Sequence, residues 1–284
     1  MKQSRTGSSR HAALVTVSLA LLFAGTACET SPDAASATQT GLDAVLWTQR
    51  SAERAALCEQ AFAAATAQLD AAALEPGWSA GGSVGGSASM GSRRPAVVLD
   101  VDETVLDNSP YQAWVIRNGT TFSPATWDAW CLKGEAEALP GSAAFLRAAR
   151  ARGLDVFYVT NRDATLKDAT FENLKRELDP AVTMDKLLCR GERGWTGDKE
   201  SRRVHVSRTH RIVMFFGDDL GDFLSPAYAS PEERMATIAE HRSKWGTRWF
   251  VLPNPMYGSW ERTIAEGDGE ARVKSKVAAL RPQE

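Results

Sequence analysis

The sequence contains little histidine and little cysteine, and it has no excess of positive charge. Its 284 residues include four His and four Cys, and 33 Lys and Arg stand against 35 Asp and Glu, so the formal net charge is −2. A nucleic-acid-binding protein would carry a basic surface, and the charge balance therefore argues against such a partner. No Cys-x-x-Cys pair occurs, which argues against a structural zinc site.

An apolar run long enough to span a bilayer, about 20 residues, is also missing. A shorter one lies near the N-terminus, where residues 12–27 follow the basic Lys2, Arg5 and Arg10. A basic start, a short apolar stretch and small residues before a cleavage point are typical of a secretory signal peptide. We therefore predict that residues 1–27 are a signal peptide, with a short N-terminal membrane anchor as the alternative.

Cys28 directly follows the predicted cleavage point. This arrangement resembles the lipobox of bacterial lipoproteins, so we expect a lipid anchor on Cys28 that holds the protein at a membrane of the cell envelope. The preceding residues 25–27 also suit the ordinary signal peptidase, and a periplasmic or secreted protein is the alternative. Residues 28–43 are rich in Ser, Thr, Ala and Asp, as in a flexible tether. Three further cysteines allow one disulfide without defining its pairing: Cys58, Cys131 and Cys189.

Four short apolar runs predict the sheet of a domain that extends over residues 44–284. They are residues 96–99, 156–159, 212–216 and 249–252, and they are rich in β-branched and aromatic side chains. Such continuous runs suit strands that are buried on both faces of a parallel sheet. Helices are predicted between or before them over residues 44–74, 140–152 and 165–178, and residues 77–93 predict a Gly/Ser loop. The alternation indicates an α/β fold.

Polar residues follow three of the apolar runs immediately. Ligands of open α/β sheets bind beyond the carboxyl ends of the strands, so we expect these side chains to meet in one site. The candidate residues are Asp100 and Asp102 after the first run, Thr160 and Asn161 after the second, and Asp218 and Asp222 after the third.

These residue types favour phosphoryl transfer. Asp100 can attack phosphorus and form an aspartyl-phosphate, and Asp102 can protonate the leaving group and later activate water. Asp100, Asp218 and the main-chain carbonyl of Asp102 offer the hard oxygen ligands that Mg²⁺ prefers. Lys199 can supply a second positive charge, although Lys186 is a competing candidate, and the hydroxyl of Thr160 can hold phosphoryl oxygens.

The same residues form a pattern that resembles a known family. Residues 98–109, Val-Leu-Asp-Val-Asp-Glu-Thr-Val-Leu-Asp-Asn-Ser, are similar to the first motif of the haloacid dehalogenase superfamily in the form found in class C acid phosphatases, which include the bacterial lipoprotein e group. Residues 159–162 are similar to the second motif, Lys199 lies where the third motif has its lysine, and Gly217-Asp218-x-x-x-Asp222 is similar to the fourth.

This resemblance implies a Rossmann-like core with a small, mainly helical cap, predicted at roughly residues 110–150. It implies an Mg²⁺-dependent acid phosphatase that acts on small phosphomonoesters, often nucleoside 5′-monophosphates, at acidic pH. Asp100 would be the nucleophile and a metal ligand, and Asp102 the acid and base. Asp218 would bind the metal and Asp222 would support the metal or the lysine. Thr160, Asn161 and Lys199 would contact the substrate.

Aromatic residues of the predicted cap are candidates for substrate binding, because aromatic rings can stack on a nucleobase. Trp127 and Tyr257 match the family's base-contacting segments best, whereas Trp114, Phe122 and Trp130 are weaker candidates. The alternative for all of them is that they fill the small core of the cap.

Two other functions stay open at this stage. A phosphotransferase would pass the phosphoryl group to an acceptor alcohol, and a surface-binding lipoprotein would keep the fold without catalysis. The intact set of acids with Lys199 argues against the second, because buried like charges without a purpose are costly. The sequence is also compatible with a homo-oligomer.

Overall fold

The structure is a computed structural model that describes residues 41–81, 93–225, 229–267 and 269–281. The predicted signal peptide and Cys28 lie outside these residues. No helix among those described is both long and apolar enough to cross a membrane. The elements are α2 (Leu42–Arg50), α3 (Ala52–Ala67), α4 (Leu69–Leu74), β1 (Arg94–Leu99), β2 (Leu106–Asp107), α6 (Ser109–Arg117), α7 (Pro124–Lys133), β3 (Glu137–Ala138), α8 (Ser142–Ala151), β4 (Asp155–Asp163), η1 (Ala164–Leu166), α9 (Lys167–Glu177), η2 (Met184–Lys186), β5 (Leu187–Arg190), η3 (Glu192–Gly194), α10 (Glu200–Ser207), β6 (His210–Gly217), η4 (Leu220–Asp222), α11 (Pro231–Glu240), β7 (Trp249–Val251), α12 (Ser259–Arg262) and α13 (Gly269–Ala278).

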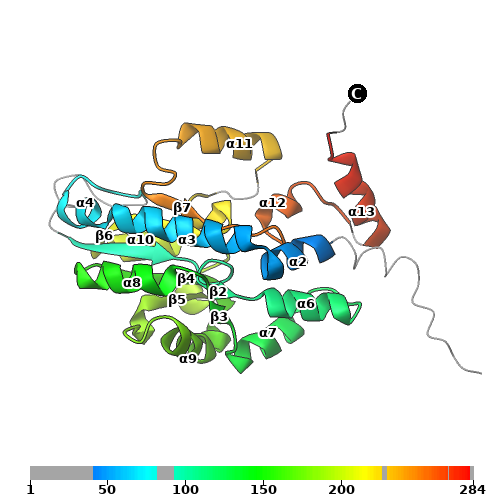
Figure 1. Ribbon diagram of the computed structural model, residues 1–284, viewed down its shortest axis with the longest axis horizontal. Coiled ribbons are helices and arrows are strands. Elements are labelled where there is room, and N and C mark those ends of the chain that lie inside the picture. Colours follow the sequence, from blue (N-terminus) through cyan, green and yellow to red (C-terminus); the bar gives the residue numbers. More distant parts are fainter. Residues whose placement is uncertain (1–40, 82–92, 226–228, 268, 282–284) are drawn as a thin grey trace, which may run out of the picture. The chain divides into compact units, whose positions relative to one another are not determined.

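The centre of the fold is a parallel five-stranded sheet with the order β5-β4-β1-β6-β7 (Figure 1). All four predicted strands are confirmed as β1, β4, β6 and β7. β5 was not predicted, because its four residues, Leu-Leu-Cys-Arg, give too short an apolar run to stand out. The sheet confirms the predicted α/β class, and its order places the ends of β4, β1 and β6 side by side.

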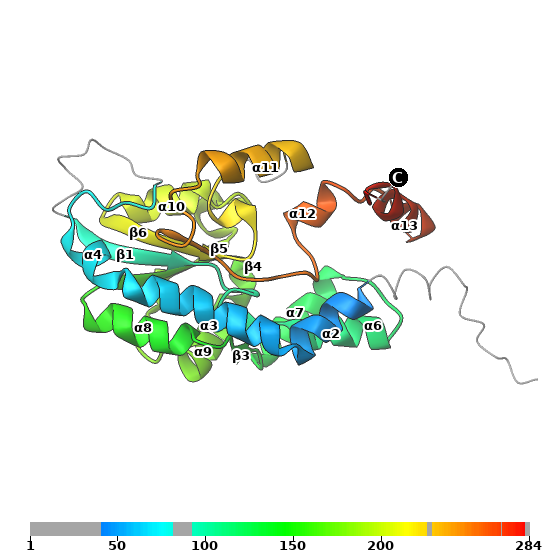
Figure 2. The same cartoon turned by 45° about the horizontal axis from the view of Figure 1, so that its top comes forward.

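Helices cover both faces of this sheet. Alternating side chains of β1 point to opposite faces, as expected for a strand: Val97 and Leu99 belong to one apolar cluster and Val98 to another. The first cluster includes residues of α3, α8 and α9, and the second includes Val206 of α10. Figure 2 shows α3 and α8 on one side of the sheet and α10 on the other. Both faces of the sheet are therefore buried, which explains why the strand sequences are nearly continuous apolar runs.

The prediction of one continuous helix over residues 44–74 is wrong. The segment forms α2, α3 and α4, which are separated at Ser51 and Gln68. Ser51 has an extended backbone, and its side chain accepts a hydrogen bond from the amide of Arg54 at the start of α3. Ser is a favoured N-cap residue, so it can begin a new helix inside an otherwise helical sequence.

Helices α6 and α7 lie between β2 and β3, two short strands that pair antiparallel outside the main sheet. These helices fall in the segment where the cap is predicted. Further along, α8 contributes Phe145, Leu146 and Ala149 to the same apolar cluster as β1, so it packs with the sheet. Cys58, Cys131 and Cys189 are free and buried.

Candidate active site

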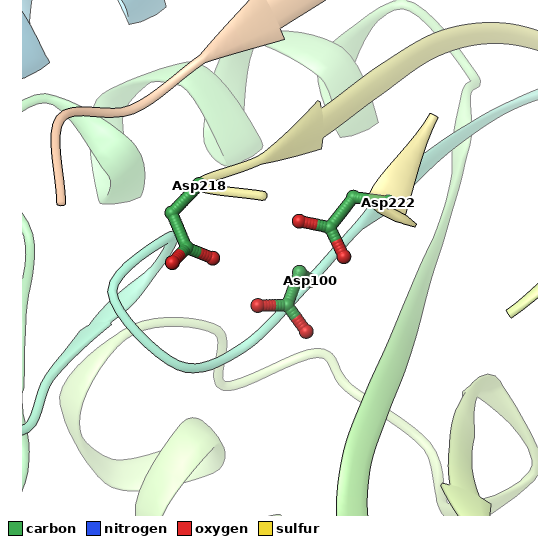
Figure 3. Close-up of side chains that lie close together, drawn as sticks. All are labelled: Asp100, Asp218 and Asp222. Carbon is green, nitrogen blue, oxygen red and sulfur yellow. The ribbon is translucent and has the colours of Figure 1, made fainter. Parts of the chain in front are cut away.

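Three aspartates meet where β1 and β6 end. Asp100 follows β1, Asp218 follows β6, and Asp222 ends the short helix η4. One carboxylate oxygen from each lies within 4.8 Å of the other two, and Figure 3 shows the three side chains turned toward a common space. Gly217 permits this arrangement, because a Cβ atom there would clash with the Asp222 carboxylate. The structure thus brings together the acids predicted from two separate strand ends.

Lys199 is the cation that this cluster contains. It precedes α10, is buried, and donates hydrogen bonds to Asp100 and, at 2.6 Å, to Oδ1 of Asp222. The competing candidate, Lys186, lies instead over the ring of Phe157, with its Nζ 4.1 Å from the ring centroid. Burial lowers the pKa of Lys199, but the carboxylates of Asp100 and Asp222 outweigh it and raise the pKa above its usual value. The lysine is therefore charged.

Two acids of the cluster, Asp100 and Asp218, hold their protons more tightly than exposed aspartates do. Burial raises the pKa of Asp100 to about 7, against the attraction of Lys199. Burial and the neighbouring Asp222 and Asp100 also raise the pKa of Asp218 well above its usual value. One lysine does not balance three carboxylates, so the cluster favours an additional positive charge.

Asp102 lies two residues beyond Asp100 but in a different environment. Its Oδ1 accepts hydrogen bonds from Nε of Arg162 and Nδ2 of Asn108, each at 2.9 Å. The Nη2 atom of Arg162 lies 2.8 Å from the same oxygen. Asn108 is fully buried, and its Oδ1 accepts a 2.8 Å hydrogen bond from the indole of Trp130. A cationic and hydrogen-bonded pocket thus holds Asp102.

Glu103, which follows Asp102 in the first motif, is buried and has a φ of 56°. Its carboxylate accepts hydrogen bonds from the main-chain amide of Asn108 at 2.8 Å and from the hydroxyl of Tyr257. Burial raises the pKa of Glu103 well above its usual value, and the charge of Asp102 adds to this. A left-handed backbone is costly for a residue with a side chain, so these contacts hold a strained turn in place.

Residues 253–259, which follow β7, contact three of the acids near the site. Asn254 donates a 2.7 Å hydrogen bond to Oδ2 of Asp218. The hydroxyl of Ser259 donates to Asp219 at 2.7 Å, and Tyr257 donates to Glu103 as described. We call these residues the 253–259 segment. It joins the loop after β6 to the turn after β1.

A cavity of about 430 Å³ opens over these groups. Its lining includes six predicted site residues that project into one space: Asp100, Asp102, Asn161, Lys199, Asp218 and Asp222. Trp127 and Tyr257 also line the cavity, whereas Trp114, Phe122 and Trp130 do not belong to its lining. The structure therefore places both preferred aromatic candidates at the cavity and the weaker ones away from it.

Thr160 and Asn161 differ in their exposure. Thr160 is fully buried; its hydroxyl accepts a 3.0 Å hydrogen bond from the amide of Arg162 and lies 3.5 Å from Oδ2 of Asp102. Asn161 is exposed in the cavity, and its side chain is fixed by Arg202 at 2.6 Å and by the carbonyl of Gly197 at 2.9 Å. A phosphate-holding role for Thr160 stays a prediction.

Several residues around the site had no predicted role. Arg162 belongs to the second motif and Asn108 to the first, but the motifs alone give neither residue a function. Arg202 and Asn254 belong to no pattern that reveals their contacts. A signal did exist for Arg162, because it lies within a buried strand, where an arginine needs a partner of opposite charge.

Comparison with known proteins agrees with this geometry. Residues 17–260 match the model of the family described as HAD superfamily, subfamily IIIB (Acid phosphatase). Acid phosphatase 1 from Solanum lycopersicum is 30% identical over 169 residues, which are 58% of this chain and 59% of that protein. The stem 31 kDa glycoprotein from Glycine max is 27% identical over 56% of this chain and 58% of that protein. The chain thus matches less than two thirds of the length of these curated relatives.

Two solved structures match almost over their full length. The class C acid phosphatase from Bacillus anthracis has a TM-score of 0.76 and 36% identity, and the match covers 87% of this chain and 99% of that one. The same enzyme with tungstate bound gives 37% identity, with the same TM-score and coverage. The family match covers well over half of the chain. The chain therefore belongs to the HAD superfamily, subfamily IIIB, the acid phosphatase family.

Proposed function

We propose that the protein hydrolyses phosphomonoesters with Asp100 as the nucleophile and Mg²⁺ as the cofactor. The observation that carries this proposal is the arrangement of Asp100 and Asp218 with Lys199 around one cavity. An anionic nucleophile and an anionic phosphoryl group need positive charge between them, and this site is built to concentrate it. The tungstate bound to the Bacillus anthracis enzyme supports the proposal, because tungstate is a tetrahedral oxyanion like phosphate.

The residues of the cluster fit a divalent cation. They offer hard carboxylate oxygens within 4.8 Å of one another, and one buried lysine leaves their negative charge unbalanced. We propose Asp100, Asp218 and the main-chain carbonyl of Asp102 as ligands, with Asp222 and Asn254 holding Lys199 and Asp218 in place. When bound, the cation supplies charge that favours ionised Asp100 and offsets the charge on the phosphoryl oxygens.

The first step forms an aspartyl-phosphate. A carboxylate oxygen of Asp100 forms a bond to phosphorus while the ester P–O bond breaks. The electron pair of that bond goes to the leaving oxygen, which takes a proton from Asp102. Lys199 donates to Asp100 and keeps its carboxylate oriented during the attack.

The second step releases inorganic phosphate. Asp102, now ionised, takes a proton from a water molecule whose oxygen attacks phosphorus. The bond between phosphorus and the Asp100 oxygen breaks, and its electron pair returns to the carboxylate. Asp102 ends the cycle protonated, as it began.

We propose nucleoside 5′-monophosphates among the substrates. Trp127 and Tyr257 line the same cavity as the acids, and either ring offers a surface on which a nucleobase can stack. The hydrogen bond from the hydroxyl of Tyr257 to Glu103 fixes this ring, so it is available as a rigid surface. We further propose that the protein is exported and anchored to a membrane through a lipid on Cys28, with a periplasmic or secreted form as the alternative.

The test is the release of inorganic phosphate from nucleoside monophosphates, sugar phosphates and aryl phosphates, measured across pH with Mg²⁺ or with a chelator. Release without an added alcohol, dependent on Mg²⁺ and strongest at acidic pH, supports the proposal. Release that requires an acceptor alcohol, with transfer of the phosphoryl group to it, would indicate a phosphotransferase. No release from any of these esters would refute both activities.

A further inference from the structure

Arg162 is a buried arginine that directs two of its nitrogen atoms at one carboxylate oxygen. Only 2% of the residue is exposed, yet it lies beside the cavity. Nε and Nη2 lie 2.9 and 2.8 Å from Oδ1 of Asp102, and Nη1 donates to the hydroxyl of Thr170 at 3.2 Å. The planar fork of an arginine fixes the direction of the group that it binds, which a lysine could not do.

Asn108 completes the contacts to the same oxygen. Its Nδ2 donates to Oδ1 of Asp102 at 2.9 Å, and its own Oδ1 accepts hydrogen bonds from Trp130 and Arg162. The side-chain amide is thus held in one orientation by the indole N–H and the guanidinium. Both donors to Asp102 are buried and cannot turn away.

The two oxygens of Asp102 consequently differ. Oδ1 has three N–H groups at 2.8 to 2.9 Å, so its lone pairs are in use and it cannot carry a proton. Oδ2 has one hydrogen-bond partner within the described residues, the hydroxyl of Thr160 at the long distance of 3.5 Å. Side-chain exposure of Asp102 is 18%, and the residue lines the cavity.

We propose that Arg162 and Asn108 are positioning residues that make Oδ2 of Asp102 the one oxygen that gives and takes the catalytic proton. This inference rests on the proposed phosphatase function and adds to it. In the first step the proton moves from Oδ2 to the leaving oxygen as the ester P–O bond breaks, and in the second step Oδ2 receives the proton of water. Oδ1 stays bonded to Arg162 and Asn108 throughout.

Arg162 also contacts the predicted substrate surface. Its guanidinium carbon lies 5.6 Å from the centroid of the Trp127 ring, a cation–π distance. The same side chain therefore touches the ring proposed to hold the substrate and the acid proposed to protonate the leaving group. It sets their relative positions, which a general acid requires.

The experiment compares kcat/KM for p-nitrophenyl phosphate, whose leaving group hardly needs a proton, with kcat/KM for an alkyl phosphate, whose leaving group does. We expect Arg162→Gln to lower the value for the alkyl ester about 100-fold and the value for the nitrophenyl ester about threefold or less. Arg162→Lys should behave in the same way, because it keeps the charge but loses the fork. Inhibition by tungstate should be unchanged in both variants, which shows that the phosphoryl site is intact.

A purely structural role would give a different pattern. Arg211→Gln is the control, because Arg211 is also buried but its guanidinium donates hydrogen bonds to the main-chain carbonyls of residues 72, 73 and 78, away from the site. It should lower stability and leave the ratio of the two substrates as in the wild type. In the Asp102→Asn background, Arg162→Gln should cause no further change in that ratio, since both act through one proton.

Two results would overturn the inference. Equal losses on both substrates in a folded Arg162→Gln or Arg162→Lys variant would mean that Arg162 supports the fold and not the acid. A further large change on top of Asp102→Asn would mean that Arg162 acts elsewhere. Because each comparison uses a wild type that releases phosphate, these failures are separate from failure of the proposed function itself.

Discussion

Asp100 and Asp102 share one turn of chain but have opposite environments. Asp100 lies among other carboxylates, and burial raises its pKa to about 7 even with Lys199 in contact. Asp102 lies among donors, with the guanidinium of Arg162 and the amide of Asn108 on one of its oxygens. The first environment is short of positive charge, and the second provides it from the protein itself.

The difference teaches how two identical side chains receive separate tasks. A carboxylate that is short of positive charge gains most from a metal ion and a lysine, which suits a nucleophile that must meet an anionic phosphoryl group. A carboxylate fixed at one oxygen offers the other in a defined direction, which suits proton transfer. The following predictions test this contrast, beginning with the largest expected effect.

Asp100→Asn should abolish turnover, with a loss of at least about 10⁴-fold in kcat, because an amide cannot form the acyl-phosphate. The measurement is steady-state phosphate release at saturating Mg²⁺. Asp70→Asn is the matched control, since Asp70 pairs with Arg152 at the surface and should have no effect. A fully active Asp100→Asn variant would show that the two aspartates do not divide the work as described.

Asp218→Asn should lower kcat/KM about 10³-fold at low Mg²⁺ and recover part of this activity when Mg²⁺ is raised, because a metal ligand is weakened. Titration of activity against Mg²⁺ measures the effect. A variant with the same Mg²⁺ dependence as the wild type would place the cation somewhere other than beside Asp218.

Trp127→Ala should raise KM for a nucleoside monophosphate about tenfold, because one stacking surface is lost, and change KM for a small alkyl phosphate less. Trp114→Ala is the control on the neighbouring helix, since Trp114 is exposed and stacks on Tyr111 away from the cavity lining. Equal changes in KM from the two substitutions would show that Trp127 is not part of the substrate site.

Without metal, Asp100→Asn should gain stability relative to the wild type as the pH rises from about 4 to about 7, by on the order of 1 kcal/mol or more. The native wild type holds a proton on Asp100 that the unfolded chain, with the ordinary pKa of 3.8, has already released. Raising the pH therefore lowers the free energy of unfolding of the wild type. The variant has no carboxyl group at position 100, so its free energy of unfolding does not fall for this reason. Urea unfolding at several pH values with a chelator measures it. A constant difference between the two proteins would contradict the raised pKa.

Much of the sheet and the acid cluster could be predicted because they depend on local patterns. Each confirmed strand is a buried apolar run, and Asp100, Asp218 and Asp222 follow such runs at places where parallel strands end together. The topology then determines that these side chains meet. For Lys199 the need for positive charge left Lys186 as a competing candidate, and the position of the third motif favoured Lys199, because nothing in its own neighbourhood distinguishes it from an exposed lysine.

The network around Asp102 could not be predicted, since two of its members come from distant parts of the chain. Arg162 lies on β4 and contacts Asp102, and Trp130 lies on α7 and holds Asn108, which is itself only six positions from Asp102. Likewise, Asn254 reaches Asp218 across 36 positions. The break between α2 and α3 at Ser51 depends on a local signal, the N-cap. That signal is ambiguous in the sequence, because a serine inside an alanine-rich stretch is also tolerated within a helix.

The 253–259 segment has a consequence for anyone who wishes to redesign the enzyme. Three of its side chains, Asn254, Tyr257 and Ser259, are each committed to an acid, whereas Pro255 and Met256 donate no side-chain hydrogen bond. A library that randomises the whole stretch would disturb the partners of three acids together with the cavity wall at Tyr257 and Ser259. Diversity confined to positions 255 and 256, which do not belong to that lining, would leave these three side-chain hydrogen bonds in place.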